Sequence, residues 1–201
     1  MTELAVLQAV RLKGRVRPAE LAATLGRDLG DIAAVVERLT AAGLLLDDAT
    51  LRISPGGRAR LETLLAKERA GIDSPAMAAA YRDFRPVNTD FKSLVTDWQI
   101  KGEAPNAHDD ADYDAAVLAR LDEVHARVVP IIEAATVQLP RLEAYGAKLL
   151  AALDKVKAGD TAWLSRPLID SYHTVWFELH EELIGAVGLT RAEAARSDDA
   201  Q

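Results

Sequence analysis

Apolar side chains recur every three or four residues along most of this chain, and the alternation typical of a strand is confined to a short stretch around residues 51–53. A spacing of three to four residues places apolar side chains on one face of an α-helix. Alanine, the best helix former, occupies 37 of the 201 positions, against 12 glycines and 8 prolines. The sequence therefore predicts a mainly α-helical protein.

Aromatic residues divide the chain into two parts. Residues 1–80 contain no aromatic side chain, and all ten lie between Tyr81 and Phe177. Residues 1–73 carry 11 basic and 10 acidic side chains, a net charge of +1, whereas residues 74–201 carry 13 and 21, a net charge of −8. The segment 70–75 contains glycine and proline, which suit a short linker. We expect two domains, residues 1–73 and residues 74–201.

The sequence lacks the motifs of several functional classes. It has no cysteine, no glycine-rich phosphate loop, no nucleophile elbow and no closely spaced metal-ligand motif. We therefore expect no enzyme activity, no cofactor and no metal site. No run of about 18 uncharged apolar residues occurs, and the N-terminal stretch has no signal-peptide pattern. A soluble cytoplasmic protein is expected.

The first domain is predicted to hold three helices, a β-hairpin and a fourth helix. The first helix ends at Lys13-Gly14, the second runs from Pro18 to Gly26, and the third ends at Gly43. Residues 44–46 and 51–53 are expected to pair as a hairpin with its turn at residues 47–50. The fourth helix is expected to begin near Arg58.

This order of elements resembles the winged-helix domain of MarR-type bacterial transcription regulators. The segments ELAATLG (20–26), AAGLL (41–45) and ISPGGRARLETLL (53–65) carry the resemblance, which covers roughly the first 70 residues. It implies a helix-turn-helix with a β-hairpin wing, a third helix that enters the major groove of duplex DNA, and a dimer. A DNA-binding transcriptional regulator is the function that this resemblance implies.

The first domain carries charges that favour DNA binding and charges that oppose it. Asp28 and Asp31 at the start of the third helix, and Asp47 and Asp48 in the hairpin turn, would repel phosphates. Eight cations are candidates for DNA contacts: Arg11, Lys13, Arg15, Arg17, Arg27, Arg38, Arg52 and Arg58. They predict binding that depends on salt and reads sequence weakly. The alternative is an accessory subunit whose acidic third helix docks a protein partner and which does not bind DNA.

The second domain is predicted to be a bundle of four or five helices. Apolar stripes cover residues 91–98 behind a cap at residues 88–89, residues 117–135, residues 142–156 and residues 168–184. Pro130 is expected to kink or break the second of these helices. Asp160 is expected to cap the last helix, and residues 190–201 to form a helical turn and then fray.

The last helix carries an apolar arc of roughly 200°, although one core-facing stripe needs only about 100°. A homodimer partner or a small-molecule effector would cover the excess. The candidate effector residues are His173, Trp176, Phe177 and His180. His173 and His180 lie seven residues apart, which does not suit one metal ion, so the histidines are expected to pack rather than bind metal.

Overall fold

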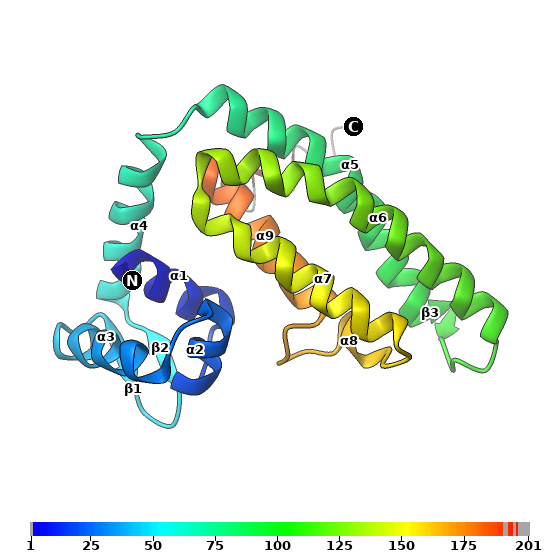
Figure 1. Cartoon of the computed structure of the whole chain (residues 1–201), viewed down its shortest axis with the longest axis horizontal. Helices are drawn as coiled ribbons and strands as arrows, with labels where there is room; N and C mark the ends of the chain where they lie inside the picture. Colours follow the sequence, from blue (N-terminus) through cyan, green and yellow to red (C-terminus); the bar gives the residue numbers. More distant parts are fainter. Residues whose placement is uncertain (1, 191–192, 195, 197–201) are drawn as a thin grey trace. The chain divides into compact units, whose positions relative to one another are not determined.

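The computed structural model describes residues 2–190, 193, 194 and 196. Over these residues the chain is mainly helical with two small antiparallel β-hairpins, which confirms the predicted mainly α class (Figure 1). The chain divides into two compact units, Met1–Ile72 (unit 1) and Asp73–Gln201 (unit 2), with the boundary one residue before the expected one. Among the described helices, none is both long enough and apolar enough to cross a membrane.

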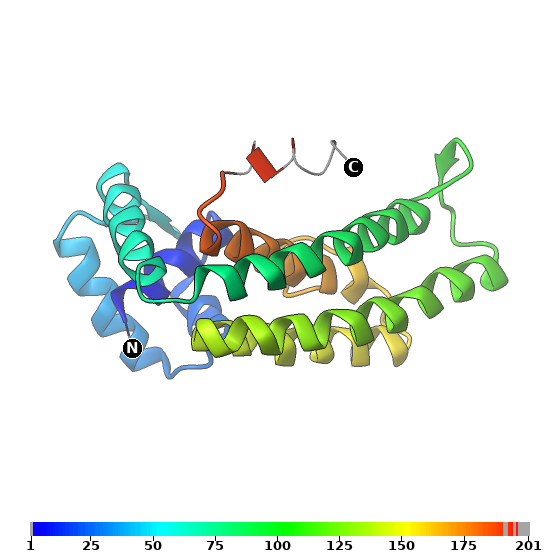
Figure 2. The same ribbon diagram turned by 90° about the horizontal axis from the view of Figure 1, so that it is seen from above.

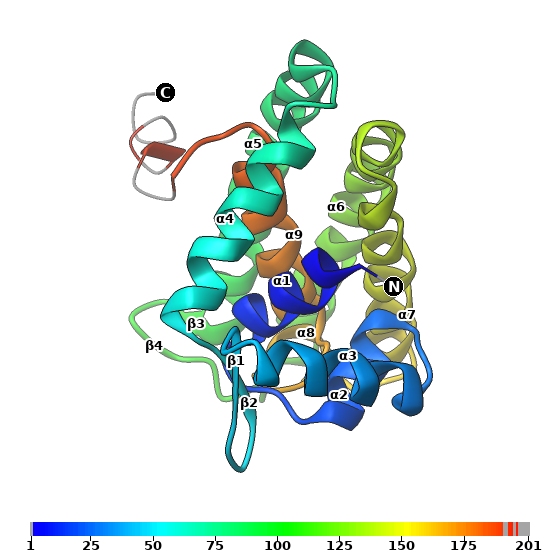
Figure 3. The same cartoon turned by 90° about the vertical axis from the view of Figure 1, so that its left-hand side faces the viewer.

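Unit 1 contains four helices and one hairpin. In chain order they are α1 (Glu3–Lys13), α2 (Pro18–Leu25), α3 (Leu29–Ala41), β1 (Leu45–Asp47), β2 (Leu51–Ile53) and α4 (Pro55–Arg69). The hairpin loop projects away from the helices of the unit (Figure 3). The core is aliphatic throughout, and side chains from all four helices and β2 are at most 1% exposed, among them Leu7, Leu21, Ile32, Leu51 and Leu61.

Local signals set most helix ends in unit 1. Pro18 occupies the first turn of α2, the backbone N–H of Arg17 donates to Glu20 at 3.0 Å, and Gly26 ends the helix with φ +59°. The predicted start of α4 near Arg58 is wrong by one turn. The helix begins at Pro55, because the hydroxyl of Ser54 accepts a hydrogen bond from the N–H of Gly57 at 2.9 Å.

Unit 2 is a helical bundle with a small hairpin at one end. Its elements are α5 (Ser74–Gln99), β3 (Ile100–Lys101), β4 (Ala104–Pro105), α6 (Ala111–Gln138), the 3-10 helix η1 (Pro140–Leu142), α7 (Glu143–Lys157), α8 (Ala162–Ser165) and α9 (Tyr172–Ala186). The four long helices form a closed ring of contacts, in which α5 packs on α6, α6 on α7, α7 on α9 and α9 on α5 (Figures 1 and 2).

The two longest helices differ from the predicted ones. α5 begins at Ser74, well before the expected cap at residues 88–89, because the carboxylate of Asp73 accepts the N–H of Ala76 at 3.0 Å. Asn88 therefore lies inside the helix, where it is 4% exposed. α6 runs through Pro130 without the expected break. Pro130 is exposed, so water can bind the carbonyl oxygen that loses its helical partner.

The last helix also begins later than predicted. α9 starts at Tyr172 behind the cap Ser171, and Leu168 lies outside it with φ +68° and 99% exposure. Asp160 does not cap this helix; its carbonyl oxygen accepts the N–H of Trp163 at 3.0 Å at the start of α8. The helical turn expected at residues 190–201 falls mainly outside the described residues.

Candidate functional site

The exposed face of α3 consists of small, apolar and acidic residues and one arginine. It consists of Leu29, Gly30, Asp31, Ala33, Ala34, Glu37, Arg38 and Ala41, whereas Ile32, Val35, Val36 and Leu39 face the core. Arg38 is the only hydrogen-bond donor among these exposed, described side chains of the helix. A helix that reads bases needs several donors and acceptors, so this face has little capacity for base recognition.

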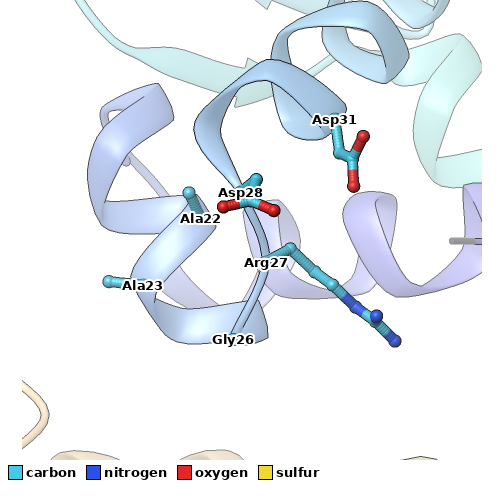
Figure 4. Close-up of a pocket in the computed structure, with 6 residues that line it drawn as sticks. All are labelled: Ala22, Ala23, Gly26, Arg27, Asp28 and Asp31. Atoms are coloured by element: carbon cyan, nitrogen blue, oxygen red, sulfur yellow. The ribbon is translucent and has the colours of Figure 1, made fainter.

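The turn between α2 and α3 forms a shallow hollow of about 380 Å³. Asp28 and Asp31 line it together with Arg27 and small residues of α2 (Figure 4). The guanidinium of Arg27 extends away from both carboxylates in this view. The two aspartates lie at the N-terminus of α3, where carboxylates interact favourably with the helix dipole but repel an approaching phosphate.

The hairpin tip is acidic as well, and its one arginine is paired. Asp47 and Asp48 are both exposed, and the guanidinium of Arg52 forms an ion pair with Asp48. The side chains of Arg52 and Asp48 are 36% and 69% exposed. The tip of the hairpin thus has no net positive charge to offer a minor groove.

Three arginines lie beside the turn end of the same hairpin. Val16 and Leu51 pair as an antiparallel bridge, with N–H···O distances of 3.2 and 2.8 Å, and both side chains face the core. The chain neighbours of Val16, Arg15 and Arg17, are exposed, and Arg52, the chain neighbour of Leu51, is partly exposed. The bridge between Val16 and Leu51 therefore brings Arg15 and Arg17 near Arg52.

The three arginines differ in their partners. Arg17 forms an exposed ion pair with Glu20 at 3.1 Å, and Arg52 pairs with Asp48. Arg15 is exposed and has no side-chain partner among the described residues. Exposed pairs contribute about 0–1 kcal/mol, so a phosphate can compete for both paired guanidinium groups.

The other predicted DNA contacts are spread over unit 1. Arg11 and Lys13 lie in the last turn of α1, where Arg11 donates to Gln8 at 3.1 Å. Arg27 lies in the turn before α3 and Arg58 in α4, and both are exposed. The pKa of Glu3 is lowered chiefly by the hydrogen bond from Arg60, and the charge of Arg38 lowers it further.

The predicted effector residues on α9 lie at or near the packed core of unit 2. Trp176 is 2% exposed, donates from Nε1 to Asn88 at 2.9 Å, and packs against Phe84 and Phe91 with ring centroids 5.1 and 4.4 Å away. His180 lies beside Phe84 at 5.4 Å. Trp176 and its neighbours therefore fill space that a ligand would need.

His173 and Phe177 lie at the margin of this core. The ring of His173 is 6.0 Å from Phe91, and Phe177 is 36% exposed. Helices α5 and α7 of the same chain pack against α9. The wide apolar arc of the last helix is thus largely covered within one chain, by neighbours that a single sequence does not reveal.

Two carboxylates of α9 are buried in unit 2. Glu178 and Glu182 are 2% and 3% exposed. Arg141 holds Glu182 with an N–O distance of 2.6 Å, and the hydroxyl of Tyr145 donates to Glu182 at 3.4 Å. Burial, and then the negative charges of the two glutamates, raise the pKa of Tyr145 well above its usual range. Sequence reasoning missed this cluster.

A recognisable signal for the cluster was present, but it was ambiguous. Arg141 and Tyr145 are four residues apart, and so are Glu178 and Glu182, which is the spacing of one helix face. That spacing is equally common on solvated surfaces. Within the described residues, no group of three or more His, Asp or Glu side chains is placed to hold a metal ion.

Comparisons with protein-family models, with curated proteins and with solved structures found no match to this chain, so its function has to be inferred from the geometry above.

Proposed function

We propose that this protein is a DNA-binding transcriptional regulator in which unit 1 is a winged-helix module that holds duplex DNA mainly through backbone phosphates. One observation carries the proposal: the bridge between Val16 and Leu51 brings the exposed Arg15 and Arg17 close to Arg52, beside the turn of the hairpin. Three guanidinium groups close together in the fold suit successive phosphate oxygens.

The element order supports the winged-helix interpretation. Three helices, a hairpin and a fourth helix follow one another, and the segment before α2 pairs with the hairpin through the bridge. In a winged helix, α3 would approach the major groove and the hairpin would approach the flanking backbone.

The face of α3 limits what such a module can read. Asp31 and Glu37 repel phosphates, the alanines offer methyl groups, and Arg38 offers the one guanidinium. Phosphate contacts fix position but carry no sequence information. Binding is therefore expected to be strongly salt-dependent and nearly indifferent to sequence.

The proposal does not require a homodimer. The excess apolar arc of the last helix suggested one, and α5 and α7 of the same chain pack against that helix. A dimer that spaces two copies of α3 on duplex DNA would have to use another surface.

Fluorescence anisotropy with the full chain and a labelled duplex of about 20 base pairs tests the proposal at about 50 mM salt. The double variant Arg15→Ala/Arg17→Ala should weaken binding at least roughly tenfold, because two phosphate contacts are lost. The matched control is Arg82→Ala/Arg166→Ala, which removes the same charge from exposed positions of unit 2. If both double variants bind like the parent protein, or if the parent does not bind, the proposal is wrong.

Protein docking is the second candidate, and the exposed face of α3 favours it. Leu29 is 52% exposed, and the adjoining alanines allow another backbone to approach closely. Together with Asp31 and Glu37 they suit a partner surface that is basic and apolar. A parent protein that fails to bind duplex DNA at about 50 mM salt would make docking the better interpretation.

A further inference from the structure

An apolar groove runs between α6 and α7 in unit 2. It has a volume of about 510 Å³, which lies within the range of small-molecule sites. The residues of α6 that line it recur at helical spacing from His125 to Val137, and those of α7 recur from Glu143 to Leu150. One stripe of each helix therefore forms each wall.

Small residues keep the groove open. Gly146 and Ala147 line the α7 wall opposite larger side chains of α6. A Cβ atom built on Gly146 would come no closer than 3.9 Å to the Cγ2 atom of Ile132, so the space beside this glycine is unfilled. Val137 and Leu150 at the groove are 77% and 49% exposed, which leaves their apolar surface in water.

The charged groups at this groove are all negative. Glu133 and Glu143 are exposed, and neither has an ion-pair partner among the described residues. No lysine or arginine lines the groove. Unit 2 as a whole carries 13 basic and 22 acidic residues, a net charge of −9, so its field attracts cations.

Two neutral polar groups complete the lining. The hydroxyl of Thr136 is buried and has no hydrogen-bond partner among the described residues, although a helical threonine usually bonds a carbonyl one turn back. The Nδ1 atom of His125 lies 3.2 Å from the hydroxyl of Tyr172. Burial, and then the charge of Lys157, lower the pKa of His125, so the imidazole is neutral at pH 7 and does not repel a cation.

We propose that the groove between α6 and α7 binds a lipophilic organic cation, with its apolar body over Val129, Ile132 and Leu150 and its charge near Glu133 and Glu143. A neutral ligand would cover the carboxylates without compensating their desolvation, and an anion would be repelled. The site lies wholly in unit 2, and none of the effector residues predicted on α9 lines it. It does not depend on whether unit 1 binds DNA.

A pair of probes with the same shape and opposite charge tests this site directly. Tetraphenylphosphonium and tetraphenylborate are titrated separately into the full chain, without DNA, by isothermal calorimetry. Tetraphenylphosphonium should bind in roughly the micromolar range, and tetraphenylborate at least about tenfold more weakly, because only the cation is attracted by the carboxylates.

Three variants locate the bound cation. Glu133→Gln/Glu143→Gln should weaken tetraphenylphosphonium binding roughly tenfold or more, because it removes both charges and keeps their shapes. Glu103→Gln/Glu123→Gln makes the same chemical change at exposed positions outside the groove and should bind like the parent protein. Gly146→Leu should abolish binding by filling the groove, with circular dichroism to check that it folds.

Three outcomes would overturn the proposal. They are the absence of tetraphenylphosphonium binding, equal affinity for the two probes, and an equal effect of the two double glutamine variants. The last outcome would mean that the cation responds to the overall charge of unit 2 and not to the groove. Because DNA is absent, failure of this test is separate from failure of the proposed DNA binding.

Discussion

Glu182 is buried in unit 2 because side chains from neighbouring segments compensate its charge. Arg141 of η1 contacts one carboxylate oxygen at 2.6 Å, and Tyr145 of α7 donates to the other at 3.4 Å. The side chain of Arg141 is 20% exposed and that of Glu182 is 3% exposed. An ion pair in this setting adds little net stability, but losing one partner leaves the other charge desolvated.

Replacing Glu182 should therefore destabilise unit 2 strongly. Glu182→Gln keeps the shape and removes the charge, and we expect a loss of about 2–4 kcal/mol in the free energy of unfolding. Urea unfolding followed by tryptophan fluorescence measures this loss, because Trp98, Trp163 and Trp176 all lie in unit 2.

An exposed ion pair of the same unit provides the control for this experiment. Asp122 pairs with Lys157 at 2.6 Å, and both side chains are 52% exposed. Asp122→Asn should change the free energy of unfolding by at most about 1 kcal/mol. Equal losses for Glu182→Gln and Asp122→Asn would contradict the account of Glu182 as a compensated buried charge.

At the scale of elements, the start of α4 depends on a glycine. A Cβ atom on Gly57 would lie 2.1 Å from the carbonyl oxygen of Leu44 and 2.9 Å from Cγ1 of Ile53. The first turn of α4 therefore approaches the hairpin more closely than any residue with a side chain permits. Gly56 is different, since its Cβ atom would meet nothing closer than 3.7 Å.

These neighbouring glycines make a matched pair of substitutions. Gly57→Ala should cost about 1–3 kcal/mol in the stability of unit 1, because backbone atoms would have to move. Gly56→Ala should be neutral or slightly stabilising, since the helix gains alanine without a clash. Hydrogen exchange of β1, β2 and α4, followed by mass spectrometry, measures the stability of unit 1. Fluorescence cannot be used for this unit, because it has no aromatic residue. Similar exchange in the two variants would rule out the close approach.

Elements with local stop signals were predictable, and elements set by packing were not. Gly14 and Gly26 end α1 and α2 at the positions that the sequence predicts. The start of α5 was mispredicted because residues 86–89 combine a proline with a cap-like pair. In the structure Phe84 and Asn88 contact Trp176 of α9, and this distant packing holds the helix continuous.

The candidate site likewise has one part that local sequence predicts and another that only tertiary contacts determine. The acidic start of α3 and the acidic hairpin tip are local, so the sequence identified both. The bridge between Val16 and Leu51 joins residues far apart in the chain, and no spacing rule predicts that it brings Arg15 and Arg17 near Arg52. The groove between α6 and α7 likewise depends on which stripes of two helices face each other.

At the scale of the whole molecule, the two units carry opposite net charges. Unit 1 has 11 basic and 9 acidic residues, a net charge of +2, and unit 2 has a net charge of −9. An acidic unit repels DNA, so unit 1 would have to supply the attraction through a few phosphate contacts. The same acidic field would concentrate organic cations around unit 2. The two proposed ligands are thus attracted to different halves of one chain.

The dependence of duplex binding on salt tests the central claim most directly. If Arg15, Arg17 and Arg52 each neutralise one phosphate, the logarithm of the association constant should fall with the logarithm of salt concentration with a slope of about −2.7. The slope of Arg15→Ala/Arg17→Ala should be about −0.9. A slope near zero for the parent protein, or equal slopes for the two proteins, would contradict phosphate binding by the arginines beside the hairpin turn.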